Sequence, residues 1–303
     1  MNGKSQRRSF DSDDVQPSEK ARGPVLVANL ITPKTSKELA FLHDLFVAND
    51  WGERFAELVD EHVILPKEGQ ALYLGSGSGG HAIALRERAG DTLRFLCIEE
   101  NEESVELARA KAAALKLETE FRHGKVDDLS LNDSQFDLVV GDGSLIHSER
   151  ISGMLREMSR VAASGATVAI SLPTFSSFGE FFSIYWEALH NCGLLDHESD
   201  VESLITNLPS VSSVEELADA AGLEDVASWT VIEEFDYESS EKFLSAPLIS
   251  DFLMSIWLET LPREFHEQVM KEIGRLINEE RHEAEFALTV KATIVTGRKS
   301  LIQ

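Results

Sequence analysis

The stretch Ala71-Leu72-Tyr73-Leu74-Gly75-Ser76-Gly77-Ser78-Gly79-Gly80 decides the fold class of this chain. Its apolar start, Ala71 to Leu74, predicts a buried strand, and the glycines allow a sharp turn and close approach of a ligand to bare backbone. The segment from His81 to Arg88 predicts the helix that follows. A second apolar run ends at Glu99, whose carboxylate can accept hydrogen bonds from both hydroxyls of a ribose. Together these features predict a nucleoside-binding βαβ unit.

The glycine spacing alone leaves the kind of nucleoside open. Gly75, Gly77 and Gly80 fit the G-x-G-x-x-G spacing of dinucleotide-dependent enzymes. Gly75, Gly77 and Gly79 fit the G-x-G-x-G spacing of S-adenosylmethionine-dependent enzymes. A flexible glycine loop in some other α/β domain is the third interpretation, and the placement of Glu99 argues against it.

The following segments continue the alternation of strands and helices. Asn101 is expected to cap a helix whose first turn holds Glu102 and Glu103, where acidic side chains favour the helix dipole. Further strands are expected over residues 120–124, 136–142 and 166–172, with a helix over 151–161 before the last of them. The strand over 136–142 ends at an acidic residue, Asp142.

In order and spacing, these segments resemble a class I S-adenosylmethionine-dependent methyltransferase of the Rossmann-like, small-molecule type. The resemblance covers about residues 70–172 and, more loosely, the tail. It implies an α/β fold, a Rossmann-like seven-stranded mostly parallel sheet with a C-terminal antiparallel hairpin, for which Thr230 to Phe235 and Phe286 to Thr296 are the candidate strands. The segments that carry the resemblance are Leu74 to Gly79, Cys97 to Asn101, Phe136 to Val140 and Arg160 to Ala166.

The resemblance implies methyltransferase activity with S-adenosyl-L-methionine as the cofactor. His147, just after the fourth strand, is the candidate general base, needed only if the acceptor must lose a proton. A histidine bonded to backbone at a helix start is the alternative interpretation. No histidine or cysteine pair has zinc-ligand spacing, so no metal is expected. The cofactor-binding candidates are Gly75, Ser76, Gly77, Gly79, Glu99, Glu100, Val126, Asp127 and Asp142.

Two positions depart from the family pattern. Tyr73 stands where the first strand of the family usually carries an acidic residue, which often helps to hold the amino group of the cofactor. Gly124-Lys125-Val126 stands where the family usually has Gly-Asp-Ala. These departures leave open a non-catalytic binding or assembly protein on a methyltransferase fold. An NAD-dependent oxidoreductase, supported only by the Gly80 spacing, is a further alternative.

The predicted organisation is a disordered leader over residues 1–24 and a single methyltransferase domain over 25–303. Within the domain, residues 36–63 form N-terminal cap helices broken at Asn49 to Gly52, residues 70–172 form the cofactor-binding core, and 175–210 and 238–284 are cap insertions. The second insertion is too apolar for a solvated loop, so it caps a substrate or makes a homodimer contact. Four aromatic side chains in the insertions are expected to line an apolar acceptor pocket: Phe178, Phe182, Trp186 and Trp257.

Composition excludes several classes of partner. The net charge of −25 and the lack of a basic cluster argue against binding nucleic acid, which requires cations to replace phosphate counterions. No apolar run reaches the length of about 20 residues that a membrane helix needs, and the start lacks the apolar core of a secretory signal, so a cytoplasmic location is expected. A small or lipid-like acceptor is the main expectation. Thr174 to Gly179 resembles malonyl-acyl-carrier-protein methyltransferases, but a chain this acidic would repel an acidic carrier.

Overall fold

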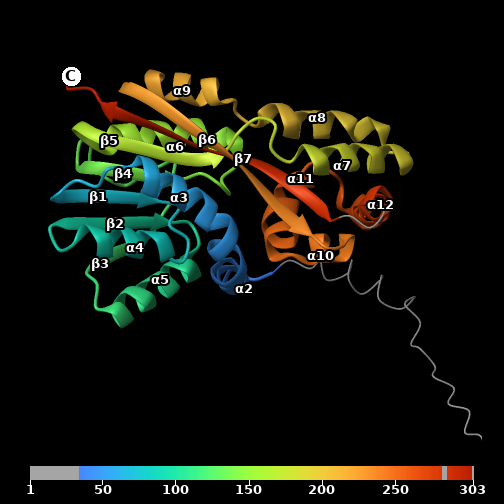
Figure 1. Cartoon of the computed structure of the whole chain (residues 1–303), viewed down its shortest axis with the longest axis horizontal. Coiled ribbons are helices and arrows are strands. Elements are labelled where there is room, and N and C mark those ends of the chain that lie inside the picture. The colour runs from blue at the N-terminus through green and yellow to red at the C-terminus, as the bar shows by residue number, and fades with distance from the viewer. Residues whose placement is uncertain (1–33, 282–284, 302–303) are drawn as a thin grey trace, which may run out of the picture.

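A seven-stranded mixed sheet organises the chain, with strand order β3-β2-β1-β4-β5-β7-β6 (Figure 1). The computed structural model describes residues 34–281 and 285–301. The first five strands are parallel, and β7 runs antiparallel to both β5 and β6, so the predicted sheet and hairpin are confirmed. The strands are β1 (Gly69–Leu74), β2 (Leu93–Glu99), β3 (Thr119–His123), β4 (Phe136–Asp142), β5 (Ala162–Pro173), β6 (Leu223–Tyr237) and β7 (Phe286–Lys299).

Helices cover both faces of this sheet, and β1 shows why. Its side chains alternate between faces, as pleating requires. Ala71 and Tyr73 join one apolar cluster together with residues of α3, α4 and α5. Leu72 and Leu74 join the other with residues of α6 and α9. The helices concerned are α3 (Glu53–His62), α4 (Gly80–Ala89), α5 (Glu102–Leu115), α6 (Ser148–Val161) and α9 (Val211–Ala220).

The predicted helix start at Asn101 is confirmed in detail. Its side-chain oxygen accepts hydrogen bonds from the backbone N–H groups of Glu103 (3.0 Å) and Ser104 (3.3 Å). These bonds satisfy donors that the first turn of a helix leaves without a partner. The cap fixes α5 directly after the carboxyl end of β2, next to Glu99.

The expected break at Asn49 to Gly52 is wrong. Helix α2 (Ser36–Leu42) continues through the π-helical segment η2 (His43–Gly52) into α3 without interruption. Turn-forming residues favour a break, but Trp51 is fully buried and its ring stacks on that of Phe178, so tertiary packing overrides local propensity. The wider π turn re-aims the side chains of η2, and such segments are frequent at functional sites.

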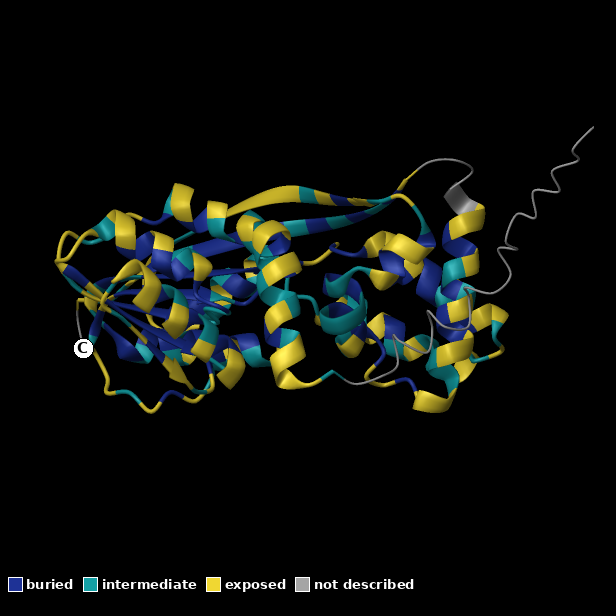
Figure 2. Cartoon of the chain, turned by 90° about the horizontal axis from the view of Figure 1, so that it is seen from below, coloured by how far each residue is buried: buried dark blue, intermediate teal, exposed yellow. Residues whose placement is uncertain are grey.

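The two insertions form a helical region at one end of the molecule (Figure 1), which is elongated when seen from below (Figure 2). Aromatic side chains hold it together; for example, the rings of Phe181 and Trp257 stack with centroids 4.1 Å apart. The described part of the chain contains no helix that is both long and apolar enough to span a membrane. The expected leader, residues 1–24, lies outside the described residues. The helices of this region are α7 (Gly179–Asn191), η3 (Leu195–His197), α8 (Glu198–Asn207), α10 (Ser240–Ser245), η4 (Leu248–Leu253), α11 (Met254–Trp257) and α12 (Arg263–Arg281).

Candidate functional site

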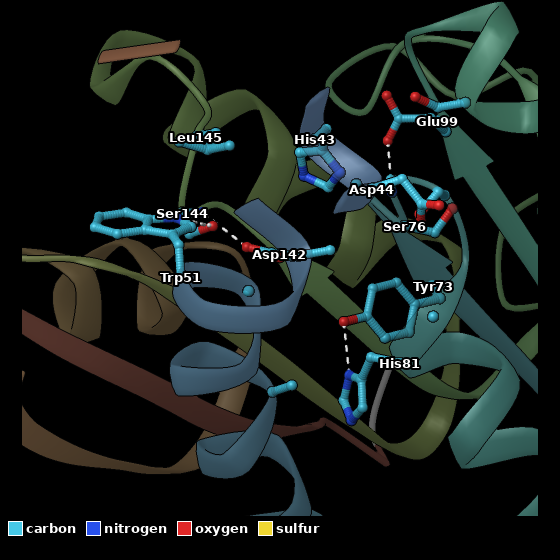
Figure 3. Close-up of a pocket in the computed structure, with 18 of the residues that line it drawn as sticks. His43, Asp44, Trp51, Tyr73, Ser76, His81, Glu99, Asp142, Ser144 and Leu145 are labelled. Carbon is cyan, nitrogen blue, oxygen red and sulfur yellow. Dashed lines mark hydrogen bonds between the residues drawn. The ribbon is translucent and has the colours of Figure 1, made fainter. Parts of the chain in front are cut away.

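A cavity of about 660 Å³ opens where β1, β2 and β4 end, and η2 and α3 form its opposite wall (Figure 3). This is the edge at which open α/β sheets bind ligands. Seven of the nine predicted cofactor residues line it: Gly75, Ser76, Gly77, Glu99, Glu100, Val126 and Asp142. Gly79 and Asp127 do not.

The glycine loop forms the floor of this cavity. Gly77 has φ +52°, and a Cβ atom there would lie 2.6 Å from Cε1 of His43 on η2. Gly75 has φ +69°, and a Cβ there would lie 2.5 Å from the carbonyl oxygen of Asp142. Both positions therefore require glycine for conformation and for space. Gly79 instead packs against Ala108 and Phe121, so its role is in the core.

Glu99 forms hydrogen bonds with both the glycine loop after β1 and the turn after β2. Its Oε2 accepts a hydrogen bond from the backbone N–H of Gly77 (2.8 Å), and its Oε1 accepts one from that of Asn101 (2.9 Å). Burial raises the pKa of this carboxyl, although the two backbone hydrogen bonds oppose the shift. An ionised carboxylate has about four acceptor positions, so two remain for a ligand.

Glu100 and Asp127 share one partner, Arg150 of α6. Its Nη1 donates to Oε2 of Glu100 (2.9 Å), and its Nε donates to Oδ2 of Asp127 (2.8 Å). The guanidinium holds the pKa of both carboxyls below the ordinary value. Glu100 also accepts a hydrogen bond from the N–H of Val126 (3.1 Å). The structure thus places Asp127 in an ion-pair network behind the cavity.

Asp142 stands at the tip of β4 and connects to the opposite wall. Its Oδ1 accepts a hydrogen bond from the N–H of Ser144 (2.8 Å), and the hydroxyl of Ser144 accepts one from Nε1 of Trp51 (3.0 Å). Burial raises the pKa of the Asp142 carboxyl. A half-buried carboxylate next to an open cavity is suited to a cationic ligand.

Tyr73, the first departure from the family pattern, begins a hydrogen-bonded chain. Its hydroxyl lies 2.9 Å from Nδ1 of His81 (Figure 3). On the other side of the ring, Nε2 of His81 lies 2.9 Å from Oδ1 of Asp60 on α3. All three residues line the cavity. Asp60 therefore supplies a carboxylate on this side of the cavity. Two hydrogen bonds connect it to Tyr73, the position on β1 at which the family usually has an acidic residue.

Two polar atoms at the cavity have no hydrogen-bond partner among the described residues: Nδ1 of His43 and Oγ of Ser76. Buried polar atoms without a hydrogen-bond partner are rare in native proteins, so these two require an explanation. Sequence reasoning missed His43 and its neighbour Asp44, which bonds to Ser78 and pairs with Lys111. No motif marks them; only the unbroken helix through η2 brings them over the glycine loop.

A second cavity of about 180 Å³ lies beside the first. Phe178, Phe182 and Trp257 line it, as does His147, whose Nδ1 is 3.8 Å from Oε2 of Glu259. Trp186 does not line this cavity; it lines, together with Phe182, another hollow between α7 and α8. The structure thus brings three of the four predicted aromatic residues together with the predicted base.

Comparisons with known proteins agree with this geometry. Residues 71–165 match the family model described as a methyltransferase domain. Ajmaline N-methyltransferase from Rauvolfia serpentina is 34% identical over 118 residues, which are 38% of this chain and 39% of that protein. A demethylmenaquinone methyltransferase from Bacillus cereus is 28% identical over 122 residues, 39% of this chain and 52% of that protein. The chain thus matches only about two fifths to one half of the length of these relatives.

Solved structures extend the similarity in fold beyond the matched domain. The YcgJ protein from Bacillus subtilis superposes with a TM-score of 0.55 at 15% identity, covering 82% of this chain and 99% of that one. The [4+2]-cyclase SpnF gives 0.50 at 16% identity, covering 83% of each chain. These values show a shared fold and, at such low identity, nothing about the reaction.

The fold is that of class I methyltransferases, and residues 71–165 match a methyltransferase domain. The sheet order, the glycine loop after β1 and the acidic residue at the end of β2 agree with this fold.

Proposed function

We propose that this chain transfers a methyl group from S-adenosylmethionine to a small or lipid-like acceptor. The observation that carries the proposal is the cavity at the ends of β1, β2 and β4, in which the glycine loop faces Glu99. Its volume of about 660 Å³ is in the range of small-molecule sites, roughly 300–1,000 Å³.

The lining of the cavity fits this cofactor. S-adenosylmethionine carries two positively charged groups, a sulfonium and an ammonium. Among the described residues that line the cavity, seven have carboxyl side chains and one is a lysine. The lysine is already paired with Asp44. Oγ of Ser76 and Nδ1 of His43 supply polar atoms without a hydrogen-bond partner in the part of the chain that the structure describes. Charge complementarity and unsatisfied polar atoms both favour a bound polar cation here.

The residues that would hold the cofactor are Ser76, Gly77, Glu99 and Asp142. When bound, the cofactor supplies a methyl group already activated on sulfur. The protein then contributes mainly by positioning the acceptor and excluding water. Where the acceptor must lose a proton, His147 in the second cavity accepts it on its unprotonated ring nitrogen.

A second candidate is a protein that uses this fold for binding or for another reaction. Tyr73 in place of the usual carboxylate favours it, and so does the fact that a cyclase has the same fold.

Two measurements separate these candidates. Calorimetric titration with S-adenosylhomocysteine should give a dissociation constant of about 1 μM or below, which corresponds to about −8 kcal/mol or tighter. Transfer of a labelled methyl group to a metabolite extract should follow. Binding without any transfer would favour the second candidate. No binding at about 100 μM, with NAD binding instead, would refute the proposed function.

A further inference from the structure

The second cavity narrows the chemical class of the acceptor, and this inference rests on the proposed function. We propose that this cavity takes a small acceptor in which a positively charged amine is attached to an apolar body.

The position of the second cavity suits an acceptor. Ser144, Leu145 and Ile146 line both cavities, so the segment after β4 forms a shared wall between the two spaces. Ser144 is held in place from both sides, because its N–H donates to Asp142 and its hydroxyl accepts from Trp51 (Figure 3). A molecule in the second cavity therefore lies next to the cofactor cavity, across a well-anchored turn.

The aromatic walls of the second cavity indicate the apolar part of the acceptor. Phe178, Phe182 and Trp257 are each at most 3% exposed and form edge-to-face contacts with centroid distances of 5.2 to 6.0 Å. Phe178 has φ +64°, an unusual conformation for a residue with a side chain, which the surrounding structure must stabilise. A volume of about 180 Å³ admits an aromatic ring or a short alkyl chain and leaves no room for a long lipid tail.

The carboxyl side chains that line the second cavity indicate the charged group of the acceptor. Three carboxyl side chains, those of Glu149, Asp200 and Glu259, line this cavity, and no lysine or arginine among the described residues does. His197 pairs with Asp200 at 3.0 Å, and His147 is near Glu259. Among the described lining residues, an anionic acceptor would meet three carboxyl side chains, and His147 is the one basic side chain beside them. A cation about 4 Å from one carboxylate gains about 1 kcal/mol in water and more where water is excluded.

The test uses three probes that share a phenyl ring and a chain of similar length: 2-phenylethylamine, 2-phenylethanol and 3-phenylpropionate. Each is titrated calorimetrically into the full chain saturated with S-adenosylhomocysteine. The amine should bind at least about tenfold more tightly than the acid, with the alcohol between them. The preference should shrink as salt is raised to about 0.5 M, because the carboxylates lie near the surface.

Variants assign the preference to the cavity. Glu259→Gln and Asp200→Asn should each weaken binding of the amine about three- to tenfold and strengthen binding of the acid. Asp219→Asn, on the exposed side of α9, is the control and should change neither. The inference is overturned if the acid binds as tightly as the amine at low salt, or if the cavity variants behave like the control.

The proposed function is judged separately. Titration of S-adenosylhomocysteine without any probe tests the cofactor site alone. If it binds and the acid probe is preferred, only the acceptor class is wrong. If it does not bind, the proposed function fails, and the probe preference can still be measured on the free protein.

Discussion

Replacement of Glu99 by glutamine tests the central contact of the cofactor site. The side chain keeps its length but loses its charge and one acceptor oxygen. The oxygen of the amide can still accept a hydrogen bond from one backbone N–H, that of Gly77 or that of Asn101. The other N–H then loses its acceptor, which in the unmodified chain lies 2.8 Å from Gly77 N and 2.9 Å from Asn101 N. Hydrogen bonds to charged groups are worth about 1.5–3 kcal/mol, so affinity for S-adenosylhomocysteine should fall about ten- to hundredfold.

The stability of Glu99→Gln should change much less than its affinity. Burial raises the pKa of Glu99 in the folded state, so the ionised carboxylate costs stability at neutral pH, and the amide removes that cost. The lost hydrogen bond, at about 1–3 kcal/mol, acts in the opposite direction. Calorimetric titration gives the affinity and thermal unfolding gives the stability.

Glu100→Gln is the matched control for Glu99→Gln. Glu100 lines the same cavity but is paired with Arg150, so its loss should disturb that network with a smaller effect on the cofactor. If Glu99→Gln binds S-adenosylhomocysteine like the unmodified chain while Glu100→Gln does not, the assignment of the ribose contact to Glu99 is refuted.

Four further variants probe other parts of the site. Gly77→Val should abolish cofactor binding but keep the helical circular-dichroism signal, because its Cβ would collide with His43 at a φ of +52°; normal binding would mean that the loop does not face the ligand. Asp142→Asn should weaken cofactor binding yet raise the melting temperature at neutral pH, since burial raises the pKa of this carboxyl and its charge costs stability; the stability gain should vanish as pH falls through the raised pKa. Tyr73→Phe removes the first hydrogen bond of the chain to His81, and cofactor affinity measured by titration should drop about fivefold, at about 1 kcal/mol per bond; an unchanged affinity would show that the chain does not serve the cofactor. Trp257→Ala should raise the KM for the acceptor and leave cofactor affinity unchanged, and it should lower the free energy of unfolding by about 3–5 kcal/mol. If the melting temperature of the unmodified chain rises with protein concentration and that of the variant does not, Trp257 instead makes a dimer contact.

The parts of the fold that sequence predicted correctly are those governed by local pattern. Short apolar runs that end next to glycine or in an acidic residue predicted β1, β2 and β4, and the Asn101 cap predicted the start of α5. Strand alternation and capping depend on neighbours in the chain, so they can be read without tertiary contacts. The strand ends were less accurate: β6 and β7 are longer than expected, because each extends as far as the other pairs with it.

The failures come from packing between distant segments. Asn49 to Gly52 has the composition of a turn, yet η2 stays helical because Trp51 is buried. Trp186 shares helix α7 and one hollow with Phe182, but only Phe182 also lines the second cavity, since side-chain direction around a helix depends on which face is packed against its neighbours. Asp127 has the residue type of a cofactor ligand, and Arg150 pairs with it instead.

The sequence by itself determined the class of fold and the floor of the site, because the glycine loop and Glu99 lie within one βαβ unit of about thirty residues. Only the tertiary structure decided the rest of the cavity. His43 lies over Gly77, and Asp60 reaches Tyr73 through His81, from a helix that precedes the sheet. Phe178 and Trp257 come from insertions far apart in the chain. Burial of apolar surface brings such segments together, and that force is non-directional, so no local pattern records which side chains will meet.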